Sequence, residues 1–249
     1  SNRIRQVVLE ILSRLPSNDV LKPYVEKLIV LVMKIMEEDN EENALLCVRI
    51  LFDLHKSYRP SLKQFVPRFL EFVQHLYKQL EATKNAIFPE PRNIGNQPPG
   101  SLLPSATSSA SIHVAPSATK TSNSSASSPS GSSTSKPLMR STCSFKVLTE
   151  CPLIVMLLFQ LYGEYVGKYV EAFISLMTSG LRLTAPSLAV RVSLEAKTRF
   201  SEMVACQVKT LSFLTYLIKG FKEIMIPHQE TIASSVVMLL KRCPNESVS

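Results

Sequence analysis

The amino-acid sequence predicts an all-α protein made of stacked antiparallel helix pairs and interrupted by a long loop. Apolar residues recur at helical spacing through most of the chain. Only seven glycines occur, and three of them fall in the loop, which leaves few for hairpin turns or phosphate-binding loops. Helices predicted to start near residues 3, 23, 41 and 61 form two pairs offset by about 38 residues, a period typical of HEAT-type repeats. The predicted architecture is therefore an α-solenoid of HEAT-type helix pairs.

The first helical block, residues 1–88, begins with two amphipathic helices. Apolar residues at i, i+3 and i+4 spacing predict a helix over 3–15 with its apolar face turned inward. A Pro-Ser-Asn-Asp turn ends this helix, and a second helix is predicted over 23–38. Because the turn is short, the two helices are expected to pack antiparallel. The predicted inward residues of the first helix are Ile4, Val7, Val8, Ile11, Leu12 and Leu15.

The third predicted helix, 41–58, is apolar on nearly all sides, so other helices must cover it on more than one side. Asp39 or Asn40 is its expected N-cap, and acidic residues follow in the first turn, where the helix dipole favours them. A fourth helix is predicted over 61–83. Pro67 lies inside that segment and predicts a kink or a fresh helix start.

The second helical block, residues 144–244, contains four more predicted helices. Their predicted ranges are 144–162, 165–177, 194–221 and 227–242, with a loop over 184–193. Pro152 is expected to kink the first of these helices. The long third helix is expected to bury Met203, Val204, Leu211, Leu214, Ile218 and Phe221. A single compact bundle of eight helices is the alternative, because spacing alone does not fix the direction of stacking.

A polar segment separates the two blocks. Residues 89–140 contain half of the 16 prolines and no aromatic residue. Such a segment has too few apolar side chains to offset the ordering entropy of its backbone, about 1 to 2 kcal/mol per residue. We therefore expect residues 89–143 to be a disordered Ser/Pro-rich linker, with 245–249 as a tail. Ser128 is a candidate site of proline-directed phosphorylation, although a tolerated insertion at a loop tip is the plainer interpretation of the segment.

Charge and motifs narrow the function classes. The net charge of +8 divides into +2 for residues 1–88, +3 for 89–140 and +3 for 141–249, and basic residues mostly alternate with acidic ones. Nucleic-acid binders concentrate Lys and Arg on one face, so direct nucleic-acid binding is not expected.

No metal, nucleotide or hydrolase motif occurs in the sequence, which therefore predicts no catalytic, cofactor-binding or metal-binding residue. The histidines are expected to lie on the surface. No apolar run reaches about 18 residues, so no membrane partner is expected.

Two charged runs are candidate surfaces. The basic run, which could meet an acidic partner or phosphates, consists of Lys56, Arg59, Lys63 and Arg68. Its plainer interpretation is a solvated hairpin loop whose basic side chains satisfy carbonyl groups at a helix C-terminus. The acidic run lies within residues 37–42 and could bind a cation or a basic peptide. Such a run is more often a solvated turn at a helix N-terminus.

Four stretches of the sequence resemble one known family in content, order and spacing. They are NEENALLCVRILFDLHKSYRP at 40–60, SFKVLTECPLIV at 144–155 followed by QLY at 160–162, QVKTLSFLTY at 207–216 and LLKRCP at 239–244. These stretches resemble the N-terminal HEAT region of the TRRAP family, which comprises transformation/transcription domain-associated protein and its fungal and plant counterparts. Both helical blocks are covered by the resemblance, and the Ser/Pro-rich linker is not.

The resemblance implies a very large scaffold that is related to the phosphatidylinositol-3-kinase-like kinases but carries an inactive kinase domain. It implies a nuclear, non-enzymatic segment of histone acetyltransferase coactivator complexes of the SAGA and NuA4 kinds. The implied partners are transcription activators and other complex subunits. Two alternatives are the regulatory HEAT arm of an active kinase of the same superfamily and a nuclear-transport-type HEAT receptor. The downstream sequence would distinguish them, because only an active kinase carries the catalytic-loop and metal-binding Asp and Asn.

Overall fold

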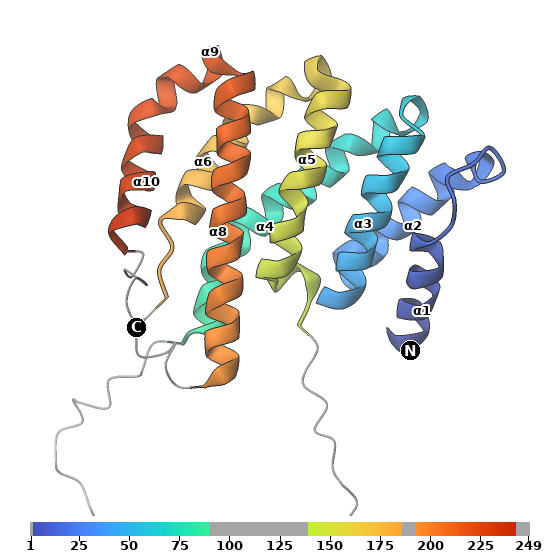
Figure 1. Cartoon of the computed structure of the whole chain (residues 1–249), viewed down its shortest axis with the longest axis horizontal. Coiled ribbons are helices and arrows are strands. Elements are labelled where there is room, and N and C mark those ends of the chain that lie inside the picture. The colour runs from blue at the N-terminus through green and yellow to red at the C-terminus, as the bar shows by residue number, and fades with distance from the viewer. Residues whose placement is uncertain (1, 90–138, 186–192, 243–249) are drawn as a thin grey trace, which may run out of the picture. The chain divides into compact units, whose positions relative to one another are not determined.

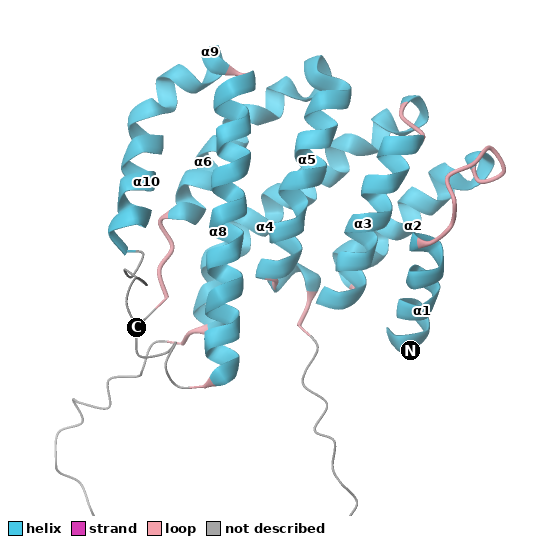
Figure 2. Cartoon of the chain, in the orientation of Figure 1, coloured by secondary structure: helices cyan, strands magenta, loops and turns pink. Residues whose placement is uncertain are grey.

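The computed structural model describes residues 2–89, 139–185 and 193–242, and these residues form helices joined by turns (Figure 2). The helices are α1 Asn2–Ser13, α2 Val25–Glu38, α3 Glu41–Ser57, α4 Val66–Ile87, α5 Phe145–Val166, α6 Val170–Leu181, α8 Leu194–Gly220, α9 Lys222–Met225 and α10 Gln229–Arg242. Within the described ranges, the β-type pairing consists of one isolated bridge between Asn40 and Arg140. The predicted all-α fold class is confirmed.

The helices stack as antiparallel pairs in two rows (Figure 1). In the first row α1 packs on α3, α3 on α5, and α5 on α8. In the second row α4 packs on α6, and α6 on α10. The second helix of each pair also packs on the first helix of the next pair, α2 on α3, α4 on α5 and α6 on α8. This arrangement is the predicted α-solenoid and not a single bundle.

The second helix of each pair begins with the same local structure. Short 3-10 turns precede it at Lys22–Tyr24, Pro60–Phe65, Gly167–Tyr169 and Ile226–His228. In the first three pairs a lysine and an aromatic N-cap residue precede a buried valine. These sets are Lys22, Tyr24 and Val25, then Lys63, Phe65 and Val66, then Lys168, Tyr169 and Val170. Because Val66 starts α4 and Pro67 follows it, the predicted fresh start at Pro67 is confirmed.

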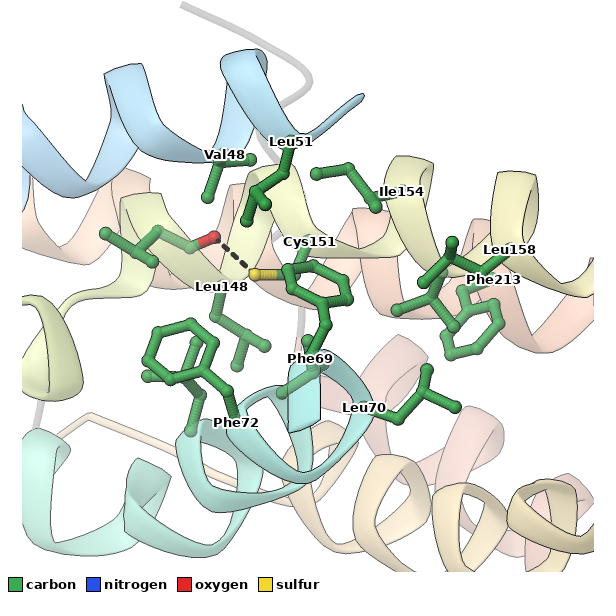
Figure 3. Packing of buried hydrophobic residues seen from close by; sticks show 14 of the residues in the cluster. Val48, Leu51, Phe69, Leu70, Phe72, Leu148, Cys151, Ile154, Leu158 and Phe213 are labelled. Atoms are coloured by element: carbon green, nitrogen blue, oxygen red, sulfur yellow. Dashed lines mark hydrogen bonds between the residues drawn. The ribbon is translucent and has the colours of Figure 1, made fainter. Parts of the chain in front are cut away.

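Residues on both sides of the long insertion belong to one compact unit. Helix α5 packs on both α3 and α4, and their facing side chains form a continuous apolar core (Figure 3). Buried residues of this core include Val48 and Leu51 from α3, Phe69 and Phe72 from α4, and Leu148 and Ile154 from α5. Helix α3 is apolar on nearly all sides because α1, α2 and α5 all cover it.

The predicted inward face of the first helix is wrong except at Leu12, which is half-buried against the core. Leu9 is the buried residue of α1. In contrast, Ile4, Val8 and Ile11 are 67%, 48% and 58% exposed. The physical reason is that α1 is the first helix of the described stack, so that no described helix covers its outer side.

The predicted buried stripe of the long helix α8 is right at Met203 and Leu214, which are buried, and wrong at Ile218, which is 42% exposed. Leu211 is only half-buried, whereas the polar residues Gln207 and Thr210 are buried. Gln207 Nε2 donates a hydrogen bond of 3.3 Å to the Gly180 carbonyl oxygen, and the hydroxyl groups of Thr210 and Tyr77 lie 3.0 Å apart in another. Apolar periodicity does not detect polar residues whose hydrogen bonds are made inside the fold.

Helix α5 departs from helical geometry at Tyr162 and not near Pro152, where the sequence predicted a kink. Tyr162 has φ −132° and ψ 31°, while Pro152 lies inside the continuous helix. The hydroxyl of Tyr162 donates a hydrogen bond to the carbonyl oxygen of Arg59. The break at Tyr162 therefore coincides with a contact between α5 and the α3–α4 turn.

Most of the predicted linker and tail lies outside the described residues. The undescribed ranges 90–138 and 243–249 contain Ser128 and the tail. Residues Met139–Cys143, at the end of the predicted linker, are part of the folded unit, because Ser141–Cys143 form a 3-10 turn and Ser141 is fully buried.

Substitution of Val48 by Asp is expected to unfold the stack. Val48 is 3% exposed, so the new carboxylate would be buried without a partner. We expect the free energy of unfolding to fall by about 4 kcal/mol or more in urea denaturation followed by circular dichroism. The control is Arg49→Asp at the exposed next residue, which should change stability by less than about 1 kcal/mol. Equal stability of the two variants would contradict the position of α3 in the core.

Candidate interaction surface

The acidic turn, residues 37–42 between α2 and α3, holds α1 in place. Asp39 is buried, and its carboxylate accepts hydrogen bonds from Arg5 Nε of α1 at 2.6 Å and from Asn43 Nδ2 at 2.9 Å. Asn40 caps α3, because its side-chain oxygen accepts a 2.9 Å hydrogen bond from the backbone N–H of Asn43. The N-cap expected at Asp39 or Asn40 is therefore Asn40.

Glu41, the first residue of α3, connects the acidic turn to α5 and α8. Ser144 Oγ donates a 2.6 Å hydrogen bond to Glu41 Oε2. Lys146 Nζ lies 3.2 Å from Glu41 Oε1, and Arg199 Nη1 lies 3.3 Å from Oε2. Glu202 pairs with the same two cations, at 3.1 Å from Lys146 and 2.8 Å from Arg199. Two carboxylates and two cations therefore link three helices.

The network keeps the pKa values of its buried carboxyl groups low. Burial by itself raises the pKa of Asp39 and of Glu41. At Asp39 the hydrogen bond from Arg5 lowers the pKa, and at Glu41 the hydrogen bonds from Ser144 and Lys146 do so. These hydrogen bonds outweigh the effect of burial, so both pKa values fall below the ordinary range. Both groups are therefore ionised at neutral pH.

The chain that returns from the long insertion is fixed to the same turn. The backbone N–H of Glu41 donates to the Met139 carbonyl oxygen at 2.9 Å, and that of Ser141 donates to the Asp39 carbonyl oxygen at 3.0 Å. The solvated-turn and cation-site interpretations of the acidic run are both wrong for Asp39 and Glu41, because their carboxylates are used inside the fold. Among the described residues, no group of three His, Cys, Asp or Glu side chains is placed to hold a metal ion.

The structure shows that the four residues of the predicted basic run do not share one environment. Arg68 forms hydrogen bonds of 2.9 Å and 2.7 Å with the carboxylate of Glu37, so its charge is compensated within the fold. This ion pair joins α4 to the acidic turn at the end of α2. The other three members, Lys56, Arg59 and Lys63, are exposed at the α3–α4 turn.

The turns that join the two helices of each pair lie along one edge of the stack, the upper edge in Figure 1. We call the basic and aromatic residues of its first three turns the turn edge: Lys22, Lys56, Arg59, Lys63, Tyr165 and Lys168. The ammonium nitrogens of Lys63 and Lys168 lie 4.9 Å and 5.5 Å from the ring centroid of Tyr165. Two cations from neighbouring helix pairs therefore share one half-buried aromatic ring.

Two hollows open on the turn edge. The first measures about 580 Å³ and is lined by Ser17, Asn18, Asp19, Lys22, Ser57, Tyr58 and Ser61. The second measures about 490 Å³ and is lined by Glu26, Ser61, Lys63, Gln64 and Tyr165. Because Ser61 lines both, the two hollows adjoin and span the turns of the first three helix pairs.

Sequence reasoning missed Tyr165 and Lys168 as members of this surface. It placed Tyr165 at the start of a helix, whereas the structure places it near the end of α5, before the 3-10 turn that contains Lys168. The signal that could have found Lys168 is the recurrent order of lysine, aromatic residue and valine at the starts of α2, α4 and α6, which does not include Tyr165.

His55 is a buried histidine near the same turn, which corrects the expected surface position. It is 1% exposed, and its Nδ1 has no hydrogen-bond partner among the described residues. Its ring meets that of Tyr162 edge to face, with centroids 6.2 Å apart. Burial lowers the pKa of His55 to about 4, so the side chain is neutral at physiological pH.

One helical segment of the described chain, Phe145–Leu181, is long and apolar enough to span a membrane by length and composition. Half of its most apolar window is buried inside the protein. A core helix that is covered on several sides has the same composition.

Stacked helix pairs with exposed turns and two open hollows define the class of protein, an α-solenoid segment. Its similarity to known proteins agrees with this class. A family model described as the Tra1 HEAT repeat central region matches residues 199–249. Over 99% of its length the chain is 32% identical to human "Transformation/transcription domain-associated protein", of which it spans 6%.

Further relatives come from other eukaryotes. Over 98% of its length the chain is 34% identical to "Transcription-associated protein 1" of Drosophila melanogaster, of which it spans 6%. It is 27% identical over 99% of its length to the "SAGA complex/NuA4 acetyltransferase complex subunit Tra1" of Schizosaccharomyces pombe, of which it spans 7%. The chain belongs to the TRRAP/Tra1 family, as a HEAT-repeat segment.

Replacing Glu41 by Gln is expected to destabilise the stack by about 1 to 3 kcal/mol, because Lys146 and Arg199 lose a charged hydrogen-bond partner. The pKa of Glu41 is lower in the folded state than in the unfolded state. Its contribution to the free energy of unfolding is therefore present above the unfolded pKa near 4.5 and is lost as pH falls through the folded value. Urea denaturation at neutral pH measures the difference. Glu42→Gln at the exposed neighbour is the control, and equal effects of both variants would contradict the network's role.

Stability is expected to fall below pH 6.5 because of His55. Its pKa is about 4 in the folded state against 6.5 for a free histidine, so only the unfolded chain takes up a proton in this interval. The loss between about pH 7 and about pH 5 should approach 2 kcal/mol in urea denaturation.

The matched variants separate His55 from the other titrating groups. His55→Leu should make this pH dependence shallower, whereas His75→Gln, at an exposed histidine of α4, should leave it intact. The same pH profile for wild type and His55→Leu would show that His55 is not the group responsible.

Proposed function

We propose that this chain is a non-enzymatic scaffold segment of a nuclear coactivator subunit in a histone acetyltransferase complex of the SAGA or NuA4 type. It presents a helical-repeat surface to transcription activators and to other subunits. Relatives named as SAGA complex/NuA4 acetyltransferase complex subunits in two yeasts support this proposal. Their names, and that of the human relative, favour it over the arm of an active kinase or a nuclear-transport receptor.

The observation that carries the scaffold proposal is an uncovered apolar end face on α1 and α2. We define the end face by its exposed apolar residues, Ile4, Val7, Val8, Ile11, Leu15 and Leu31. A hollow of about 480 Å³ lies between the two helices, with Val8, Leu12 and Leu31 among its lining. A contiguous apolar surface of this kind indicates a contact with another protein surface.

The occupant that fits the end face is another helix pair of the same solenoid. Within the stack, α3, α5 and α8 each receive the preceding helix of the first row on one side, and α1 presents the corresponding side without cover. A terminal repeat of a solenoid needs a polar outer face to stay soluble, and α1 lacks one. The chain spans 6% of the human relative, which supports an internal position in a longer polypeptide.

The end face is tested by Ile4→Lys combined with Ile11→Lys. Both side chains are exposed here, so the isolated segment should keep its stability within about 1 kcal/mol. In the full-length protein the two charges would be buried at a helix-pair junction, so limited proteolysis should reveal a new cleavage site near this junction. Val20→Lys, at a 78% exposed residue of the α1–α2 turn, is the control. Unchanged proteolysis of the full-length double variant would contradict a covered end face.

The complex is tested by purifying the tagged full-length protein and crosslinking it through lysines. Crosslinks from exposed lysines of this segment, such as Lys27 and Lys78, to acetyltransferase-complex subunits are expected. A full-length protein that purifies without acetyltransferase activity or subunits would contradict the proposed function.

A further inference from the structure

The interface between the two helical blocks is built like a contact between two proteins. Its apolar centre comes from α3 and α4 of the first block and α5 of the second, which bury Val48, Phe69 and Leu148 among others (Figure 3). The covalent connection between the blocks runs through residues 90–138, which lie outside the described residues. Cys47, the one cysteine of the first block, is a free thiol, so no disulfide joins the described parts of the two blocks.

Glu41 makes this interface specific. Its carboxylate belongs to the first block, and its partners belong to the second: Ser144 Oγ at 2.6 Å, Lys146 Nζ at 3.2 Å and Arg199 Nη1 at 3.3 Å. In any other register the same surfaces would bury the carboxylate away from these groups, which is unfavourable. Glu41 therefore selects one arrangement of the two blocks.

Helix α4 adds a second set of matched contacts, away from Glu41. The hydroxyl groups of Tyr77 and of Thr210 in α8 are hydrogen-bonded at 3.0 Å inside the core. At Gly180 of α6 an added Cβ atom would lie 3.0 Å from Leu80 Cδ1, so the missing side chain lets α6 approach α4 closely. Shape and polar groups thus match on both helices of the pair α3–α4.

Neither block can bury its own apolar surface. A helix pair of a solenoid covers its apolar face only by stacking on its neighbours, and α5 carries ten buried residues that face several neighbours. The covalent connection helps by keeping the effective concentration of one block at the other in about the millimolar range. An interface with a dissociation constant well below that value holds without the connection.

We propose that the two helical blocks bind each other as specific partners, so that a chain cut within residues 90–138 remains one folded particle. The face of α3 and α4 is the binding surface, and α5 together with α8 is the partner that it fits. The stack then does not depend on an intact insertion. This inference goes beyond the proposed scaffold function and rests on the described helices.

The test is a specific protease recognition sequence inserted between Ser124 and Ser125, so that the folded 249-residue chain can be cut. A denaturing gel verifies the cut. In size-exclusion chromatography both fragments should elute together at the position of the uncut chain. The melting temperature of the cut protein should rise with protein concentration, and that of the uncut chain should not, because only the cut protein dissociates on unfolding.

Matched variants test the role of Glu41 in the cut protein. Glu41→Lys places a cation against Lys146 and Arg199, so the dissociation constant of the fragments should rise about tenfold or more in a dilution series. Glu42→Lys makes the same charge change at an exposed neighbour and should change it by less than about threefold. Where circular dichroism shows that uncut Glu41→Lys is unfolded, Glu41→Gln, which keeps the side-chain shape, takes its place.

Separate elution of the two fragments, or unfolding of the protein once it is cut, would overturn the inference. Elution at twice the mass of the uncut chain would overturn it as well, because the blocks would then be exchanged between copies. Equal weakening by the substitutions at Glu41 and Glu42 would contradict the specificity assigned to Glu41. None of these measurements involves the acetyltransferase complex, so failure of this inference and failure of the proposed function remain distinguishable.

Discussion

The stack depends on the buried carboxylate of Glu41 and the cations that surround it. A carboxylate in this position is costly unless hydrogen bonds and opposite charges compensate it. Ser144, the N-cap of α5, together with Lys146 of α5 and Arg199 of α8, provides that compensation across the long insertion. The two helical blocks therefore form one structure, because the first block supplies the carboxylate of Glu41 and the second supplies the cations that pair with it. This coupling explains why a long polar insertion is compatible with a continuous stack.

Apolar packing between the helices stabilises the stack in addition to the ion-pair network of Glu41. Helix α3 has apolar residues on nearly all sides because three neighbours cover it, and α5 is in the same situation. The uncovered side of α1 shows the other consequence of repeat stacking, since among the described helices α3 and α5 each lie between two helices of the first row and α1 contacts only one.

The polar groups of this fold divide into those that hold it together and those that remain free. Asp39, Glu41, Arg68 and Arg199 are charged residues whose partners lie within the fold. Lys63 and Lys168 of the turn edge lie over the ring of Tyr165 and have no carboxylate partner among the described residues. Charged residues close in sequence thus have different roles, as Lys63 and Arg68 show, because only one of them reaches the acidic turn.

By itself the sequence determined the local structure and the family. Helical periodicity placed α3 and α8 within a residue of their ends, and Asn40 and Pro67 marked helix starts, because caps and proline act within one turn. The four family-like stretches led to the TRRAP family. Only the tertiary structure decided which face of α1 is bare and why Gln207 and His55 are buried. Those outcomes depend on partners far along the chain, such as Ser144, which is 103 residues from Glu41, and no local pattern records them.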